Sequence, residues 1–290
     1  MIWLIGNKGM LGQEVEAILK RRNLEYCASD IDVDITVREP VDRFMADRVP
    51  DWIVNCAAYT AVDKAETDED RARQINADGP ENIGRAAATA GARVIHVSTD
   101  YVFDGQGSRP YEATDPVAPA GAYGRTKAEG ERRLQGVCPN SFIVRTAWLY
   151  GVGGKNFVET MLRVMSEREE VRVVADQRGS PTYAVDLASA IVEFVTRDSS
   201  DFGIYHYTND GETTWHGFAE EIKRQGLERG LLATRCEVAA ITSADYPTPA
   251  ARPHYSVLSK TAIRDALGIA IPDWRDGLSR YLDQRSNHAE

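Results

Sequence analysis

The chain has few cysteines and no long apolar segment. Its four cysteines, Cys27, Cys56, Cys138 and Cys236, lie far apart in 290 residues, and no two form a C-x-x-C pair. Zinc sites and disulfide frameworks use closely and regularly spaced cysteines, so neither is predicted. No apolar run reaches the ~20 residues that a membrane-spanning helix needs, and no charged leader precedes an apolar stretch. We therefore expect a cytoplasmic protein with reduced thiols and no membrane partner.

Positive charge is also scarce. The 34 basic and 44 acidic residues give a formal net charge of -10. Nucleic acids and anionic membranes bind through basic surfaces, so neither is an expected partner, and a small-molecule ligand is favoured. A hydrophobic content of 43% in 290 residues is enough for a large core in one or two domains.

The amino terminus combines an apolar run with a glycine-rich loop. The first five residues are Met-Ile-Trp-Leu-Ile, and the next seven contain Gly6, Gly9 and Gly12 in a G-x-x-G-x-x-G spacing. A short buried strand, a tight glycine turn and a helix amino terminus together offer backbone N–H groups to a pyrophosphate. A second apolar segment, 24–29, ends in Asp30, where an acid that binds ribose belongs. The pattern predicts a dinucleotide site, with an ordinary strand-to-helix turn as the alternative.

Apolar runs alternate with helical stretches through the first half of the chain. The predicted strands cover 52–55, 92–98 and 142–145, and the predicted helices cover 82–90 and 123–134. This alternation predicts an α/β fold, a Rossmann-type doubly wound parallel sheet with crossover helices. Ligands of such sheets bind beyond the carboxyl ends of the strands. Segments 55–58, 98–100 and 146–148 should therefore meet the glycine loop in one crevice.

The second half loses this regular alternation and contains several prolines, among them Pro247, Pro249 and Pro253. Its predicted helices cover 156–167, 185–196 and 214–225. We expect a dinucleotide-binding domain over 1–150, to which 182–207 returns as a helix and a strand. A second, smaller α/β substrate domain should comprise 151–181 and 208–290.

Tyr123 and Lys127 lie four residues apart in a predicted helix, which places both side chains on one face, about one turn apart. A phenol titrates near pH ~10, so at neutral pH it holds a proton that it can donate to a carbonyl as hydride arrives. A nearby ammonium favours the phenolate that forms. The pair alone is a weak motif. Together with the glycine loop and the Ser-Thr-Asp segment that ends in Asp100, it predicts a hydride-transfer site.

Longer segments resemble one enzyme family. They cover 6–12, 55–66, 98–105, 123–127, 145–148 and 246–253. Almost from end to end, the chain resembles the extended short-chain dehydrogenase/reductases and, within them, the dTDP-4-dehydrorhamnose reductases. The resemblance implies NAD(P)H-dependent reduction of the C4 ketone of dTDP-4-dehydro-L-rhamnose to dTDP-L-rhamnose.

The resemblance also implies a role for each matching residue. Tyr123 would protonate the developing alkoxide, Lys127 would anchor the nicotinamide ribose, and Thr99 would bind the sugar oxygen. The other expected substrate contacts are Asp100, Trp148 and Arg252, whose guanidinium suits a diphosphate. The expected cofactor contacts are Gly6, Gly9, Met10, Leu11, Gly12, Asp30, Asp34, Ile35, Ala57, Ala58, Tyr59, Thr60, Tyr123 and Lys127.

The sequence leaves the cofactor as NADPH or NADH. Asp30 suits a ribose 2'-hydroxyl and would repel a 2'-phosphate, which favours NADH. Arg21, Arg22 and Arg38 weaken that preference because they add positive charge nearby.

Some members of this family form a dimer around a magnesium ion held by three glutamates. The aligned positions here are Glu14, Val185 and Arg275, and two of these carry no carboxylate. Magnesium requires oxygen ligands, so we expect no metal site and either a monomer or a metal-independent homodimer.

Two other functions stay open. The same Tyr123, Lys127 and Thr99 would serve a reductase or epimerase of another NDP-sugar, because a fold does not determine its substrate. A non-catalytic nucleotide-binding regulatory subunit, like that of methionine adenosyltransferase, also resembles this family. The intact catalytic residues favour an enzyme.

Two further features have structural interpretations. His96 lies within an apolar strand and is predicted to be a core histidine with its hydrogen bonds satisfied. The acidic run of Glu66, Asp68, Glu69 and Asp70 is predicted to be the solvated start of a helix.

Overall fold

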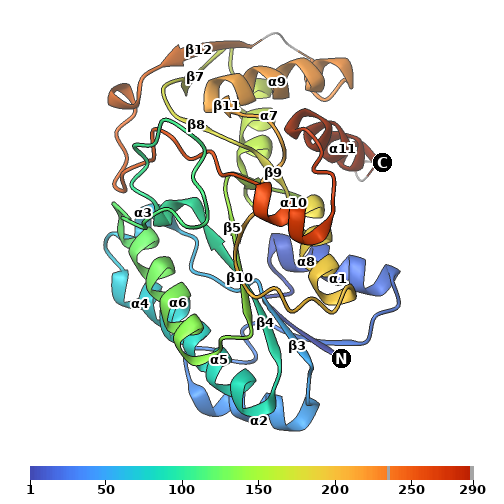
Figure 1. Cartoon of the computed structure of the whole chain (residues 1–290). Helices are drawn as coiled ribbons and strands as arrows, with labels where there is room; N and C mark the ends of the chain where they lie inside the picture. The colour runs from blue at the N-terminus through green and yellow to red at the C-terminus, as the bar shows by residue number, and fades with distance from the viewer. Residues whose placement is uncertain (234–235, 288–290) are drawn as a thin grey trace.

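Parallel strands form the centre of the molecule. The computed structural model describes residues 1–233 and 236–287, and within them a six-stranded sheet has the order β10-β5-β4-β3-β1-β2. The strands are β1 (Ile2–Ile5), β2 (Tyr26–Ser29), β3 (Trp52–Asn55), β4 (Arg93–Thr99), β5 (Ser141–Thr146) and β10 (Gly203–His206). Every neighbouring pair is parallel. The predicted Rossmann-type α/β fold is confirmed, and the strand order reverses between β1 and β3 (Figure 1).

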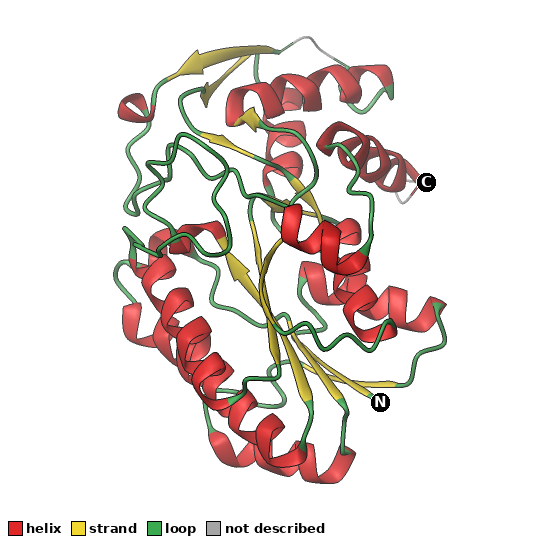
Figure 2. Ribbon diagram, in the orientation of Figure 1, coloured by secondary structure: helices red, strands yellow, loops and turns green. Residues whose placement is uncertain are grey.

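Helices cover both faces of this sheet. One face carries α1 (Met10–Arg21), α8 (Ala184–Thr196) and α10 (Thr261–Leu267), and the other carries α2 (Arg38–Arg48), α5 (Gly79–Ala90) and α6 (Ala122–Val137). Figure 2 shows the sheet in yellow between the two red layers. Because β1 is buried on both sides, its residues are all apolar: Leu4 packs in the core under α1 and α8, while Trp3 packs in the core under α2 and α5.

The remaining elements pack around a separate apolar cluster that includes Phe218, Trp274 and Tyr281. Its helices are α7 (Phe157–Glu167), α9 (Trp215–Glu228) and α11 (Trp274–Asn287). Three strand pairs join it: β7 (Glu170–Val174) with β12 (Glu237–Ile241), β6 (Leu149–Tyr150) with β9 (Thr182–Tyr183), and β8 (Arg178–Gly179) with β11 (Thr213–Thr214). These elements occupy the upper part of Figure 1.

The segment 182–207 runs back toward the main sheet. Helix α8 packs on α1, and β10 pairs with β5 at the sheet edge. The division into two domains stays a prediction, and residues 234–235 and 288–290 of the predicted substrate domain lie outside the described residues. Among the residues that are described, no helix is both long and apolar enough to cross a membrane.

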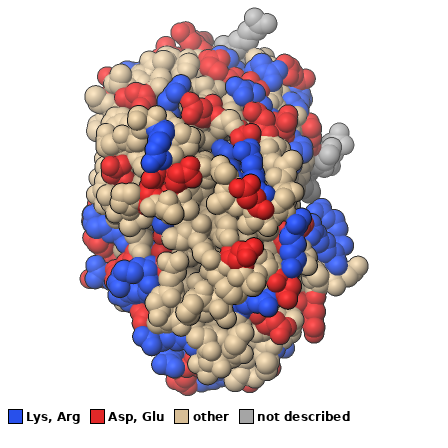
Figure 3. All heavy atoms as spheres, in the orientation of Figure 1, with Lys and Arg blue, Asp and Glu red and all other residues tan. Residues whose placement is uncertain are grey.

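Short helical elements follow the carboxyl ends of β3 and β4. They are α3 (Val62–Ala65), α4 (Glu69–Arg73), the π-helical turn η1 (Gln74–Asp78) and the 3-10 turn η2 (Asp100–Val102). A further 3-10 turn, η3 (Ser243–Asp245), follows β12 and bonds to Asp176 after β7. The face drawn in Figure 3 carries basic and acidic side chains interspersed, without one extended basic patch.

Helix α6 lies in direct contact with the backbone of η1 and η2. A Cβ atom at Gly124 would overlap the carbonyl oxygen of Tyr101, and one at Gly130 would overlap the carbonyl oxygen of Asn76. Glycine at these two positions therefore allows α6 to pack directly against the backbone of η1 and η2.

Gly130→Ala should lower the free energy of unfolding by about 1 to 3 kcal/mol, because the added methyl group has no room. Gly136→Ala is the matched control on the same helix, since a Cβ there meets nothing within 4 Å. It should raise the free energy of unfolding by about 0.5 to 1 kcal/mol through helix propensity. Urea unfolding measures both values, and equal effects at the two sites would contradict this packing.

Candidate active site

A cleft of about 470 Å³ opens at the carboxyl ends of β1, β3, β4 and β5. It brings together segments that are far apart in the sequence, as the strand-end argument predicts. The predicted site residues that line it are Gly9, Met10, Leu11, Gly12, Ala58, Thr60, Thr99, Asp100, Tyr123, Lys127 and Trp148. Those that lie outside its lining are Gly6, Asp30, Asp34, Ile35, Ala57, Tyr59 and Arg252.

The glycine loop forms one end of the cleft. Gly6 has a φ of 77°, in the left-handed region, and a Cβ at Gly12 would overlap the Gly6 carbonyl oxygen. Gly9 caps α1 without a side-chain hydrogen bond to the first turn. The loop is thus a cradle that side chains would fill, and it leads to the amino terminus of α1, whose first residues line the cleft. These residues fit the pyrophosphate of a dinucleotide.

Three of the predicted cofactor contacts, Asp30, Asp34 and Ile35, lie outside the cleft lining and bond or pack locally. Asp30 follows β2, and its Oδ2 accepts a hydrogen bond of 3.1 Å from the backbone N–H of Lys8 in the glycine loop. Asp34 accepts hydrogen bonds from the backbone and hydroxyl of Thr36 at 2.9 and 2.7 Å. Ile35 is buried in the core beneath α2 and α5. Asp30 is therefore the one of the three that touches the glycine loop.

The segment after β3 is held by two buried asparagines. The backbone N–H of Ala57 donates to Asn55 Oδ1 at 3.0 Å, and that of Tyr59 donates to Asn76 Oδ1 at 2.8 Å. Asn76 also donates to the hydroxyl of Thr126 on α6 at 3.2 Å. These bonds connect the cleft floor after β3 to the helix that carries Tyr123.

Tyr123 is a buried phenol at the first turn of α6. Burial raises its pKa to about 12, while hydrogen bonding with Thr99 acts in the opposite direction. The hydroxyl of Thr99 donates to Asp100 Oδ1 at 2.9 Å. The three residues therefore form one cluster in the cleft, and the phenol holds its proton at neutral pH.

Asp100 carries an unpaired oxygen into the same cluster. Its side chain is buried, and Oδ2 has no hydrogen-bond partner within the described part of the chain. Burial raises the pKa of this carboxyl to about 6. A buried acceptor without a partner suits a hydroxyl group of a bound ligand.

Lys127 is only 1% exposed. Its Nζ donates to the carbonyl oxygen of Val97 at 2.7 Å and lies 3.2 Å from Nε2 of His96. Burial lowers its pKa to about 8. His96 is itself buried, as its apolar strand predicts, but sequence reasoning did not reveal its contact with Lys127.

Trp148 and Arg252 have constrained surroundings. Trp148 has a φ of 49°, unusual for a residue other than glycine, and its ring stacks on Trp215 with centroids 3.5 Å apart. Arg252 Nη2 donates to Asp63 Oδ2 at 2.7 Å, whereas its Nη1 is buried without a partner among the described residues. Arg252 is thus not a solvated surface side chain, and it retains a free donor.

The acidic run is not simply solvated. Glu66 Oε1 accepts a hydrogen bond of 2.8 Å from the backbone N–H of Ala122, at the start of α6. Glu69 pairs with Arg125 of the same helix at 2.8 Å. The run does begin a helix, since Asp68 precedes α4 and Glu69 and Asp70 lie in its first turn. Glu66 and Glu69 additionally bind α6, which the sequence could not reveal because these partners lie more than fifty residues away.

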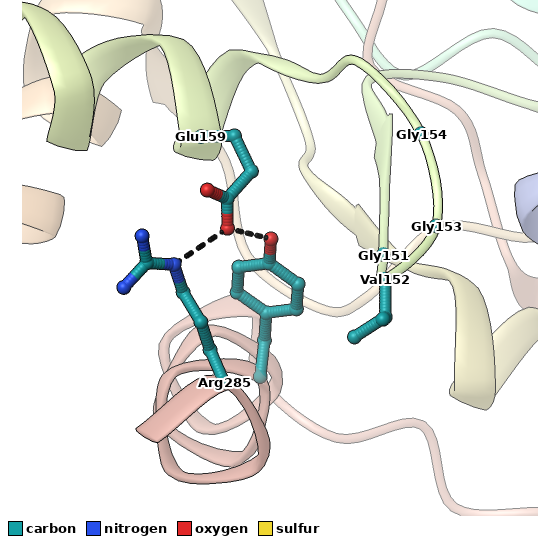
Figure 4. Close-up of a pocket in the computed structure, with 7 residues that line it drawn as sticks. Gly151, Val152, Gly153, Gly154, Glu159 and Arg285 are labelled. Atoms are coloured by element: carbon teal, nitrogen blue, oxygen red, sulfur yellow. Dashed lines mark hydrogen bonds and ion pairs between the residues drawn. The ribbon is translucent and has the colours of Figure 1, made fainter. Parts of the chain in front are cut away.

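A loop at 151–155 contributes Lys155 to the cleft, which sequence reasoning missed. On this loop lies a second cavity of about 330 Å³, lined by Gly151, Val152, Gly153, Gly154, Glu159, Tyr281 and Arg285 (Figure 4). Glu159 accepts hydrogen bonds from Tyr281 and Arg285 at 2.5 and 2.8 Å. Glu159 and Arg285 neutralise each other here, whereas the cleft contains the unpaired carboxylate oxygen of Asp100.

Comparisons with known proteins agree with this geometry. Residues 1–287 match the family model described as the RmlD substrate binding domain. The chain is 40% identical over 281 residues to dTDP-4-dehydrorhamnose reductase of Aggregatibacter actinomycetemcomitans, covering 95% of this chain and 96% of the relative. The chain belongs to the dTDP-4-dehydrorhamnose reductase family. The resemblance inferred from the sequence motifs is confirmed.

Two further similar proteins are informative. The spore coat polysaccharide biosynthesis protein SpsK of Bacillus subtilis is 39% identical over 288 residues, covering 99% of this chain and 98% of the relative. The dTDP-4-dehydrorhamnose reductase of Bacillus anthracis, solved in complex with NADP, has a TM-score of 0.91 and 36% identity, with 98% of each chain covered. The family likeness thus extends over the cleft and both apolar clusters.

Burial of Lys127 should make stability depend on pH. The pKa of a lysine in the unfolded chain is ~10.4, whereas burial lowers the pKa of Lys127 in the folded protein to about 8. Between these values the unfolded chain binds the proton that the folded chain has lost, so the free energy of unfolding rises with pH.

Lys127→Met should abolish about 2 kcal/mol of this rise between pH ~8 and ~10. Denaturant unfolding at stepped pH measures it, with Lys64→Met, at an exposed lysine, as the control that should follow the wild type. Parallel curves for the wild type and Lys127→Met would show that Lys127 titrates normally.

Proposed function

We propose that this protein reduces the C4 ketone of dTDP-4-dehydro-L-rhamnose to dTDP-L-rhamnose, with NADPH or NADH as the reductant. The observation that carries the proposal is the continuity of one cleft from the glycine loop to the buried Tyr123, Thr99 and Asp100. The family relatives that are named dTDP-4-dehydrorhamnose reductases, and the NADP bound to one of them, support the same conclusion.

The chemistry needs a proton donor beside the carbonyl oxygen. The bound reduced nicotinamide supplies a hydride to the carbonyl carbon. Tyr123 retains its phenolic proton at neutral pH, because burial raises its pKa to about 12. It donates that proton to the carbonyl oxygen as negative charge develops there. The Thr99 hydroxyl, which belongs to the same hydrogen-bonded cluster, orients that oxygen.

Other side chains would hold the sugar nucleotide. The unpaired Oδ2 of Asp100 accepts a hydrogen bond from a sugar hydroxyl, and the indole of Trp148 packs against the ring face. The free Nη1 of Arg252 binds the diphosphate, while Asp63 holds the other nitrogen of the guanidinium.

A different NDP-sugar is the second candidate substrate. The chain is 39% identical to SpsK, which is named for spore coat polysaccharide biosynthesis, and this likeness supports a different NDP-sugar as the second candidate. A panel of 4-keto sugar nucleotides with different bases and sugars separates the two substrates by their kcat/KM values.

We further propose a cytoplasmic enzyme that is a monomer or a metal-independent homodimer. All four cysteines are free thiols, which suits a reducing compartment. The oligomer proposal derives from Val185 and Arg275, which lack the oxygen ligands that magnesium requires.

Tyr123→Phe should lower kcat for reduction of dTDP-4-dehydro-L-rhamnose by about 10²- to 10⁴-fold, because the ring remains and only the proton donor is lost. The cofactor dissociation constant should change little. The rate follows from the absorbance of reduced nicotinamide, and Tyr26→Phe, at a tyrosine bonded to Glu16 outside the cleft lining, is the control. Retained activity in Tyr123→Phe would exclude this residue as the acid.

Arg252→Gln should raise KM for the sugar nucleotide by about 10-fold or more, with a smaller effect on kcat, because it removes a charged contact to a part of the substrate that does not react. Arg163→Gln, on the exposed side of α7, is the control. Unchanged KM in Arg252→Gln would place the diphosphate elsewhere.

A further inference from the structure

Two residues outside the cleft lining hold the indole of Trp148, which lies within it. Trp215 stacks on this indole with ring centroids 3.5 Å apart and planes inclined by 9°. Gly179 lies against the edge of the indole, because a Cβ atom there would come within 2.5 Å of Cε2 and 2.7 Å of Nε1. Trp148 is therefore confined on one face by an aromatic ring and along one edge by backbone.

One strand pair supplies both contacts. Gly179 belongs to β8, and Trp215 follows β11 directly as the first residue of α9 (Figure 1). In the antiparallel pair of β8 and β11, Gly179 lies opposite Thr213. Thr214 caps α9, since its hydroxyl oxygen accepts a hydrogen bond of 3.0 Å from the Gly217 N–H. The strand pair and the cap together fix the two contacts relative to each other.

The backbone of Trp148 is also held in an unfavourable conformation. Its φ of 49° lies in the left-handed region, which is costly for a bulky side chain. The Trp148 carbonyl oxygen accepts a hydrogen bond of 3.1 Å from the Thr182 N–H, and the Thr182 hydroxyl donates to the Ala147 carbonyl oxygen at 2.7 Å. The surrounding structure thus imposes this conformation, and residues held in this way cluster at functional sites.

The stack decides which surface of Trp148 a ligand can reach. Rings 3.5 Å apart are in van der Waals contact, so nothing can enter between them. The Trp215 ring is backed in turn by Phe157 of α7, with centroids 4.6 Å apart. The indole surface that remains is the part that lines the cleft, together with Tyr123 and Asp100.

We infer that Trp215 and Gly179 are positioning residues for the sugar of the nucleotide substrate. They form a clamp that holds the Trp148 indole at the place where it packs against the sugar ring. This inference rests on the proposed function, in which Trp148 contacts the sugar and Tyr123 delivers the proton. Recognition of the sugar then depends on two residues that themselves lie outside the cleft lining.

The first test measures the position of Trp148 without any ligand. Trp148→Phe identifies the Trp148 signal among the indole N–H signals of the five tryptophans in a proton–nitrogen NMR spectrum. An aromatic ring shields protons that lie above its face, so Trp215→Leu should move the Trp148 signal downfield. Trp215→Phe keeps a ring and should move it less. An unchanged Trp148 signal in Trp215→Leu would overturn the clamp.

The second test separates the sugar from the rest of the nucleotide. Calorimetric titration gives the Kd of dTDP and of dTDP-L-rhamnose, and the ratio of the two values reports what the sugar adds to binding. This ratio should fall about 3- to 10-fold in Trp215→Leu, as expected for the loss of one aromatic packing contact. Trp215→Phe should retain most of the ratio, and the Kd of the reduced cofactor should stay unchanged in both variants.

Gly179→Ala tests the clamp from the edge of the indole. It leaves both tryptophans in place but puts a methyl group where the indole edge lies, so it should lower the same ratio. Phe44→Leu is the matched control. It removes one ring of the stack between Phe44 and Trp3, whose centroids are 4.4 Å apart and which lies outside the cleft lining, so the ratio should not change.

The outcomes separate this inference from the proposed function. A ratio equal to that of the wild type in both Trp215→Leu and Gly179→Ala would overturn the inference, and so would an equal fall in Phe44→Leu. Neither measurement needs turnover. A wild-type protein that binds dTDP-L-rhamnose through the clamp but does not reduce the ketone would refute the proposed function and leave the inference standing.

Discussion

The close packing of α6 against η1 and η2, beside the carboxyl ends of the strands, is the constraint on which the site depends. Gly124 and Gly130 allow the helix to contact the backbone of η2 and η1, where any side chain would overlap a carbonyl oxygen. Glu66 then caps the start of α6 through the Ala122 N–H. With the helix held in this position, the four-residue spacing of Tyr123 and Lys127 brings both into the cleft at the strand ends.

Burial of polar groups is the second feature of the site. Arg145 and Glu131 form an ion pair that is nearly inaccessible to solvent, and Ser98 donates to the same carboxylate. Such a pair is costly to desolvate, and removing either partner leaves a buried charge. Burial lowers the pKa of the nearby Lys127, and the negative charge of Glu131 opposes this shift only in part.

Much of the sheet could be predicted from the sequence, because local patterns carry the information. The strand at 52–55 is an apolar run that ends in Asn55, and the glycine loop with Tyr123 and Lys127 predicts the cleft. The contacts that hold the site could not be predicted in the same way. Glu66 meets Ala122 across 56 residues, and β7 pairs with β12 although α8, β10, α9 and shorter strands lie between them in the sequence. Neither periodicity nor composition reports which distant partner a side chain finds.

The site also contains departures from local preference that only tertiary packing explains. Trp148 adopts a left-handed backbone conformation, in which its ring stacks on Trp215. His96 follows the pattern of a core residue, yet its two ring nitrogens connect Asn55 to Lys127. Both residues look ordinary in the sequence, and their importance arises from neighbours on other elements.

Isotope transfer tests the central claim most directly. The protein would be incubated with dTDP-4-dehydro-L-rhamnose and reduced nicotinamide that carries deuterium at the transferred position, and the product analysed by NMR. The proposed reduction yields dTDP-L-rhamnose with deuterium bonded to C4 of the sugar. A product without deuterium at C4, or no product despite cofactor binding, would contradict it.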